Sequence, residues 1–105
     1  MLDFPILETG EIDGSIYLNR NGRLGGVGDV EIEILNEEGK IIGSTTSSYD
    51  GFYLFSSIPS GKYLIRISPA QIKKLSLVDV RPIQVTINNN NQFISGINFR
   101  LQRKQ

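Results

Sequence analysis

The stretch Ser47–Ile67, SSYDGFYLFSSIPSGKYLIRI, decides the fold. Asp50-Gly51 and Pro59-Ser60-Gly61 are turn signals, because proline presets one backbone angle of a turn and glycine accepts conformations that other residues avoid. Apolar residues recur at every second position after each turn, at Tyr53, Phe55, Tyr63, Ile65 and Ile67. This period is that of a half-buried β-strand. The stretch therefore predicts two strands joined as a hairpin by a tight turn, with one apolar face.

The same period recurs outside this hairpin. It is clearest in Asp29–Leu35, where Val30, Ile32 and Ile34 are expected to face inward. Four further strands are predicted at residues 11–18, 41–48, 81–87 and 93–101, and Ser68-Pro69 predicts a short helical turn. Seven short strands with regularly spaced turn signals indicate an all-β fold, a seven-stranded antiparallel β-sandwich.

The chain has 105 residues, a length that suits one domain with one core. The alternating strands place that domain at residues 11–101. Residues 1–10 contain Pro5 and no clear period, so they are expected to form a lead-in or linker, and residues 102–105 a frayed tail. Residues 19–28 contain four glycines, which predict an irregular loop.

Composition argues against an enzyme. Cysteine and histidine are both absent, which removes disulfides, thiolate ligands, the commonest general base and the commonest metal ligand. The sequence therefore predicts no catalytic residues, no metal site and no cofactor. Glu31 and Glu33 would lie about 6–7 Å apart on one strand face, but an exposed polar face explains them better than a paired-carboxylate site.

Charge is balanced overall and uneven along the chain. Lysines and arginines number 11, as do aspartates and glutamates. Residues 1–50 hold ten acids and three bases, a balance of −7, whereas residues 51–105 hold one acid and eight bases, a balance of +7. The split could match successive domains or a partner, or early and late strands could neutralise each other inside one sandwich. Without a basic surface that carries aromatic residues or a long apolar run, neither nucleic-acid binding nor membrane insertion is predicted.

Three aromatic residues are candidate contact residues. Tyr17, Tyr49 and Phe52 are expected on outward faces or loops, where a sugar or a partner surface could stack. The alternative is that they pack beneath loops or beside residues 69–75. We take them as the predicted site residues for a partner or glycan.

Four segments together resemble a known group of modules. They are Gly14–Gly22, Gly28–Ile34, Asp50–Phe55 and Ile58–Tyr63. In this order and spacing they are similar to carboxypeptidase-regulatory-like and SdrD B-like domains, which are related to Cna B-type domains. The resemblance implies a transthyretin-like (prealbumin-like) sandwich and a non-catalytic part of a larger exported protein.

Two specialised features of that group do not fit these residues. Cna B-type domains often form an isopeptide bond from a lysine on the first strand to an Asn or Asp on the last strand. Asn98 is present, but residues 11–18 contain no lysine. SdrD B-like domains commonly bind calcium in an acidic loop after the first strand, whereas here Arg20 and Arg23 lie in that loop.

The sequence thus predicts a structural or interaction module: a spacer, cap or docking domain of a larger surface, adhesin or outer-membrane usher-like protein. The expected partners are neighbouring domains or another surface protein. The expected location is extracellular, at the cell surface, or in the periplasm and outer membrane. The alternative function is a carbohydrate-binding module of a secreted protein.

Overall fold

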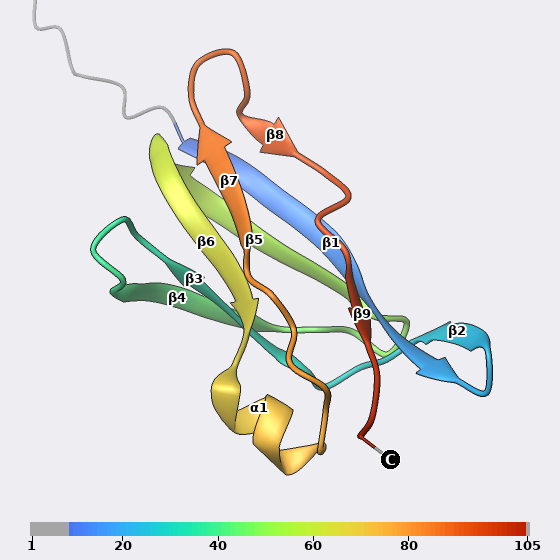
Figure 1. Cartoon of the computed structure of the whole chain (residues 1–105). Coiled ribbons are helices and arrows are strands. Elements are labelled where there is room, and N and C mark those ends of the chain that lie inside the picture. The colour runs from blue at the N-terminus through green and yellow to red at the C-terminus, as the bar shows by residue number, and fades with distance from the viewer. Residues whose placement is uncertain (1–8, 105) are drawn as a thin grey trace, which may run out of the picture.

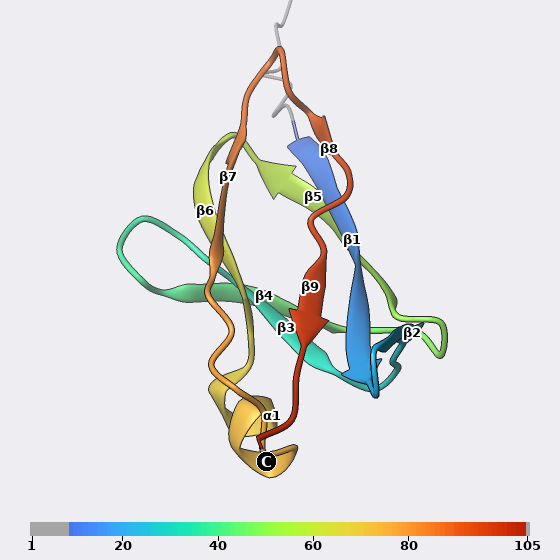
Figure 2. The same cartoon turned by 45° about the vertical axis from the view of Figure 1, so that its right-hand side comes forward.

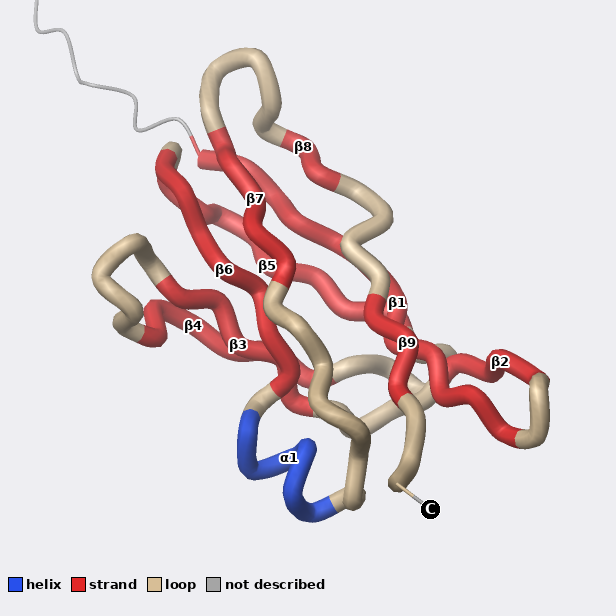
Figure 3. The backbone as a smooth tube through the Cα atoms, in the orientation of Figure 1, coloured by secondary structure: helices blue, strands red, loops and turns tan. Residues whose placement is uncertain are grey.

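The computed structural model describes residues 9–104, and most of them form strands in two packed sheets (Figures 1 and 3). The first sheet is built on the long strand β1 (Thr9–Arg20). Its other strands are β2 (Arg23–Gly26), β5 (Phe52–Pro59), β8 (Phe93–Ile94) and β9 (Phe99–Leu101). The second sheet has the order β4-β3-β6-β7, with β3 (Glu31–Leu35), β4 (Ile41–Thr46), β6 (Gly61–Ile67) and β7 (Ile83–Ile87).

The core lies between the two sheets and confirms the predicted alternation. Val30, Ile32 and Ile34 are buried on β3, as the sequence indicates. Tyr53 and Phe55 are buried on β5. The other buried apolar residues are Ile12, Ile16, Leu18, Leu35, Ile58, Tyr63, Ile65, Ile67, Leu77, Val85, Ile87, Phe99 and Leu101. Since burial of one such side chain contributes about 1.5–3 kcal/mol, this shared interior dominates the stability of the fold.

The predicted hairpin of the organising stretch is wrong, although both of its strands exist. β5 pairs with β1 in the first sheet, whereas β6 pairs with β3 and β7 in the second. Ser60 links the two strands at a corner where the chain changes sheets. A turn signal indicates that the chain changes direction, but it does not determine which strands then pair.

The predicted loop over residues 19–28 contains a strand. Asn21 and Gly22 have φ values of 53° and 84°, which suit a two-residue hairpin turn with positive φ at both positions. β2 then pairs with the end of β1, from Arg20 opposite Arg23 to Tyr17 opposite Gly26. The loop prediction was wrong because Asn21-Gly22 is a hairpin turn signal, so the residues on either side of it can pair.

The sandwich is not wholly antiparallel. β8 and β9 both run parallel to β1, with Glu11 opposite Phe93 and Ile16 opposite Phe99. The single strand predicted over residues 93–101 is interrupted between them, where Gly96 has φ of 78°. With β2 and this interruption, the seven predicted strands become nine within residues 9–104.

Both predicted boundaries of the domain need correction. Thr9 and Gly10, assigned to the lead-in, begin β1 opposite Pro59 and Ile58. The remaining lead-in residues, 1–8, lie outside the described part of the chain. The predicted frayed tail is bound along the loop after the helix, because Gln102 accepts a hydrogen bond from Val78 and Lys104 donates one to Ser76.

The predicted helical turn is α1 (Pro69–Lys74), with proline in its first turn. α1 lies at the end of the sandwich where the C-terminus emerges (Figure 2). Among the described residues, no helix is long and apolar enough to cross a membrane.

Candidate functional site

The three predicted contact residues lie near one end of the first sheet. Tyr17 is half-buried on the outward face of β1. Phe52 is the first residue of β5 and pairs with Ser15 of β1, which precedes Tyr17 by two residues. The side chain of Phe52 is 43% exposed. Tyr49 lies in the connection from β4 to β5 and is 91% exposed. Strand pairing therefore brings Tyr17 and Phe52 into one neighbourhood, while the hollows described next are lined by other residues.

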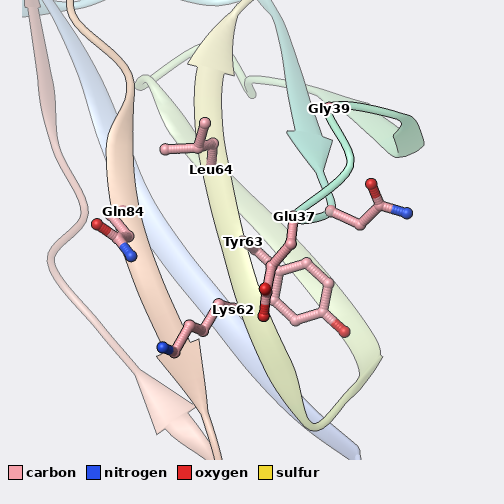
Figure 4. A pocket seen from close by; sticks show the side chains of 7 residues that line it. Glu37, Gly39, Lys62, Tyr63, Leu64 and Gln84 are labelled. Carbon is pink, nitrogen blue, oxygen red and sulfur yellow. The ribbon is translucent and has the colours of Figure 1, made fainter.

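One hollow of about 440 Å³ lies against β6 and the turn between β3 and β4 (Figure 4). It is lined by Asn36, Glu37, Gly39, Lys62, Tyr63, Leu64 and Gln84. The hydroxyl of Tyr63 donates a 2.6 Å hydrogen bond to the Pro59 carbonyl, and burial raises the pKa of Tyr63. The phenol proton is therefore engaged in a structural hydrogen bond.

A larger groove of about 680 Å³ lies between the edge strands β4 and β5. It is lined by Asn36, Ile42, Gly43, Ser44, Thr45, Leu54, Phe55, Ser56, Ser57, Ile58, Pro59 and Tyr63. All of these residues are uncharged. The groove therefore suits contact with apolar or hydroxyl-bearing groups more than with an ion.

The buried polar groups hold strands together. The Tyr53 hydroxyl donates a 2.5 Å hydrogen bond to the Ile97 carbonyl. Burial, with a smaller effect from the charge of Asp13, raises the pKa of Tyr53. Asp13 in turn accepts hydrogen bonds from Ser95 Oγ and the Gly96 amide, each 3.3 Å long. These contacts fix the segment between β8 and β9 onto β1.

Two polar side chains make structural hydrogen bonds that the sequence did not predict. Asn98 Oδ1 accepts a 2.9 Å hydrogen bond from the Ser15 amide. Ser47 is buried, donates to the Val27 carbonyl at 2.8 Å and accepts from the Val30 amide at 3.1 Å. No local motif marks either residue, because their partners lie between 17 and 83 positions away.

The acidic pair of β3 belongs to an outer sheet face. Glu33 forms a salt bridge of 2.9 Å with Arg66 on the neighbouring strand β6. This pair joins an acid of the first half of the chain to a base of the second half, as the local-neutralisation interpretation expected. Glu31 lies two residues earlier on the same face.

The loop that the resemblance associates with calcium is used for a turn. Asn19 Oδ1 accepts a hydrogen bond from the Gly22 amide at 3.1 Å, so that oxygen supports the hairpin between β1 and β2. Among residues 9–104, no group of three or more acidic side chains is placed to hold a metal ion.

The fold and these contacts define a two-sheet β-sandwich module. A family model described as the second β-sandwich domain of BOS complex subunit NOMO1-like proteins matches residues 11–100. The chain belongs to this family of β-sandwich domains.

Curated relatives match only part of a longer protein. Serine-aspartate repeat-containing protein E of Staphylococcus aureus is 33% identical over 78 residues, which cover 66% of this chain and 7% of that protein. Colossin-A of Dictyostelium discoideum is 37% identical over 62 residues, which cover 59% of this chain and 1% of that protein. The first match confirms the resemblance to serine-aspartate repeat modules, and both relatives are many times longer than the matched segment.

A solved structure confirms the fold. The major pilin subunit BcpA of Bacillus cereus aligns with a TM-score of 0.70 at 20% identity, over 91% of this chain and 30% of that one. At this identity the similarity shows the shared sandwich alone.

Proposed function

We propose that this chain is a non-catalytic, load-bearing spacer and docking module of a longer cell-surface protein. The observation that carries the proposal is the pairing of β1 with β9, near the two ends of the described chain. The two strands run parallel, with Ile16 opposite Phe99 and Leu18 opposite Leu101. The start of β1 and the C-terminus lie at opposite ends of the sandwich (Figures 1 and 2).

This arrangement resists extension. A force that separates the two ends pulls β1 and β9 past each other along their length. All bonds between two strands are then loaded together, whereas strands peeled apart from one end lose their bonds one at a time. The ladder also extends beyond β9, because the Ile97 amide donates to the Asp13 carbonyl at 3.0 Å and Asn98 accepts from Ser15.

The comparisons support a place within a larger surface assembly. The curated relatives contain the matched segment as a small part of their length, and BcpA is a major pilin subunit. We therefore expect neighbouring domains of the same protein to be the partners. The relatives give no support to the periplasmic or outer-membrane locations that the sequence also allowed.

Single-molecule stretching tests the proposal. A polyprotein of this chain, pulled through its two ends, should unfold at higher force than the same chain pulled between a cysteine introduced at Glu38 and the C-terminus. The chain has no other cysteine, so that attachment is unique. Equal forces in the two geometries would contradict the load-bearing role of the β1–β9 pair.

The Asn98 contact provides a matched pair of variants. Asn98→Ala removes the acceptor of the Ser15 amide and should lower the end-to-end unfolding force. Asn90→Ala, in the exposed turn between β7 and β8, should leave the force unchanged.

Glycan binding is a second candidate, favoured by the exposure of Tyr49 and Phe52 near Tyr17. Aromatic rings on an accessible surface can stack on sugars. NMR titration with soluble oligosaccharides should then shift the amides of these three residues. Shifts that are absent, or that persist in Tyr49→Ala, would contradict glycan binding at this place.

A further inference from the structure

Strand β4 is an open edge of the second sheet, and its pairing with β3 is interrupted at Ile42. Its sequence, IIGSTT, contains no charged residue and no proline, and Ile41 and Ile42 are 46% and 43% exposed. Pairing is irregular in both edge strands, opposite the Gly10–Ile12 step for β5 and at Ile42 for β4. The facing edge strand β5 has two further devices, because Ser57 has φ of 56° and Pro59 ends the strand. Bulges, prolines and charges are the common devices against edge-to-edge pairing, so β4 is the less protected of these two edges.

The backbone of β4 presents bonding groups along its free side. Ser47, just after β4, donates to the Val30 carbonyl of the neighbouring strand. Successive residues of a strand direct their backbone groups to alternate sides. Thr45 therefore bonds toward β3, as Ser47 does, and the N–H and C=O groups of Ser44 and Thr46 point away from β3. Glu31 is the β3 residue opposite Thr46, and its carbonyl accepts a hydrogen bond from the Ser68 amide on the side of β3 away from β4. Glu31 and Thr46 therefore do not bond to each other, which agrees with the outward direction of the Thr46 backbone groups.

We propose that β4 pairs antiparallel with β4 of a second copy of this chain, across a two-fold axis. Two four-stranded sheets would then form one continuous sheet of eight strands. Pairing centred on Ser44 places Ser44 opposite its own copy and Thr46 opposite Ile42, the residue at which the register of β4 shifts. A two-fold contact of this kind uses the same surface on both partners, so it closes as a dimer and does not propagate.

Charge is compatible with this partner. β4 brings no charge to the contact, and the uncharged groove between β4 and β5 lies directly beside it. Two acids of β3 adjoin β4 on the outer face, Glu33 opposite Ser44 and Glu31 opposite Thr46, and Glu33 is the nearer to the axis. The two copies of Glu33 would be about 14 Å apart, three inter-strand spacings, which exceeds the Debye length of about 8 Å at physiological salt. Arg66 also neutralises each Glu33.

Sedimentation equilibrium of the full chain at physiological salt tests the proposal. The fraction of dimer should rise with protein concentration. Ser44→Lys should weaken association by about tenfold or more, because lysine would face lysine across the axis. The matched control is Gln84→Lys, which adds the same charge to an exposed position on β7, the opposite edge of the same sheet, and should leave association unchanged.

Amide exchange gives a readout that does not depend on a variant. In the wild-type chain, the Ser44 and Thr46 amides should become protected as concentration rises, while the Thr45 amide is protected throughout. A monomer at all concentrations up to about 1 mM would overturn the proposal. So would equal effects of the two lysine variants, or exchange at Ser44 and Thr46 that does not depend on concentration. The outcome is independent of the stretching experiment, which probes contacts within one copy.

Discussion

The hydroxyl of Tyr53 reaches over Gly14 of β1, within the first sheet, to the main-chain carbonyl of Ile97, 44 positions further along the chain, with an O–O distance of 2.5 Å. The ring of Tyr53 packs edge-on against Phe55 and also contacts Phe99. Tyr53 thus connects β5 to the segment just before β9, on the other side of β1. Tyr53 was predicted only as part of the apolar face of β5. Its hydroxyl also joins β5 to the segment before β9 in the same sheet.

Tyr53→Phe should destabilise the protein by about 1–3 kcal/mol, because it leaves the Ile97 carbonyl without this donor. The effect should depend on pH. The pKa of Tyr53 is raised in the folded state, so above pH 10, the ordinary value, the unfolded chain releases the phenol proton while the folded chain retains it. Stability therefore falls with rising pH, by up to about 1.4 kcal/mol per pH unit from this group.

Urea denaturation of both proteins at pH 8 and pH 11 checks this prediction. The wild type should lose more stability than Tyr53→Phe over that interval, because the variant lacks the titrating phenol. Equal losses in the two proteins would show that the Tyr53 phenol is not protected from ionisation in the folded state.

Gly14→Ala should be strongly destabilising. A Cβ at Gly14 would lie 1.8 Å from the Ile97 carbonyl oxygen, so β1 and the segment before β9 would have to separate. We expect a loss of roughly 3 kcal/mol, the upper part of the usual range for overpacking. Gly25→Ala is the control, because a Cβ there meets no atom within 4 Å. Thermal unfolding that gives equal losses for both variants would contradict the close approach at Gly14.

The sequence was sufficient to predict the strands and their inward faces. In β3 apolar and polar residues alternate without a break, because one face of the strand packs against the core and the other faces outward. The residue type at each position therefore indicates which face it lies on. Strand pairing was harder to predict. The local pattern of β5 and β6 does not specify which strands they pair with. For β5, the pairing depends on contacts distant in sequence, such as the hydrogen bond from Tyr53 to Ile97.

The candidate sites were less accessible to prediction than the strands. Tyr17, Tyr49 and Phe52 stay predicted contact residues. The open edge at β4 could not be recognised beforehand, because an uncharged strand is equally typical of the middle of a sheet. Only the sheet order shows that IIGSTT lies at an edge. The Asn98 contact was also hidden, since its partner Ser15 lies 83 positions away.

Ser47→Ala should cost about 1–3 kcal/mol. The buried hydroxyl donates to Val27 and accepts from Val30, and without it both backbone groups lose a partner in a site closed to water. Ser48→Ala changes the adjacent, exposed serine and should alter stability by less than about 0.5 kcal/mol. Chemical denaturation of the two variants compares them directly. A larger loss for Ser48→Ala would place the structural hydroxyl at the wrong residue.

Phe55→Ala should destabilise the protein by about 3–5 kcal/mol, because Phe55 is only 5% exposed and packs against Tyr53 in the core. Leu54→Ala is the matched control on the same strand, since Leu54 faces outward and is partly exposed. Guanidinium denaturation should give a much smaller loss for that variant. If Phe55→Ala loses less than about 1 kcal/mol, β5 presents its other face to the core, and Leu54 rather than Phe55 should then show the large effect.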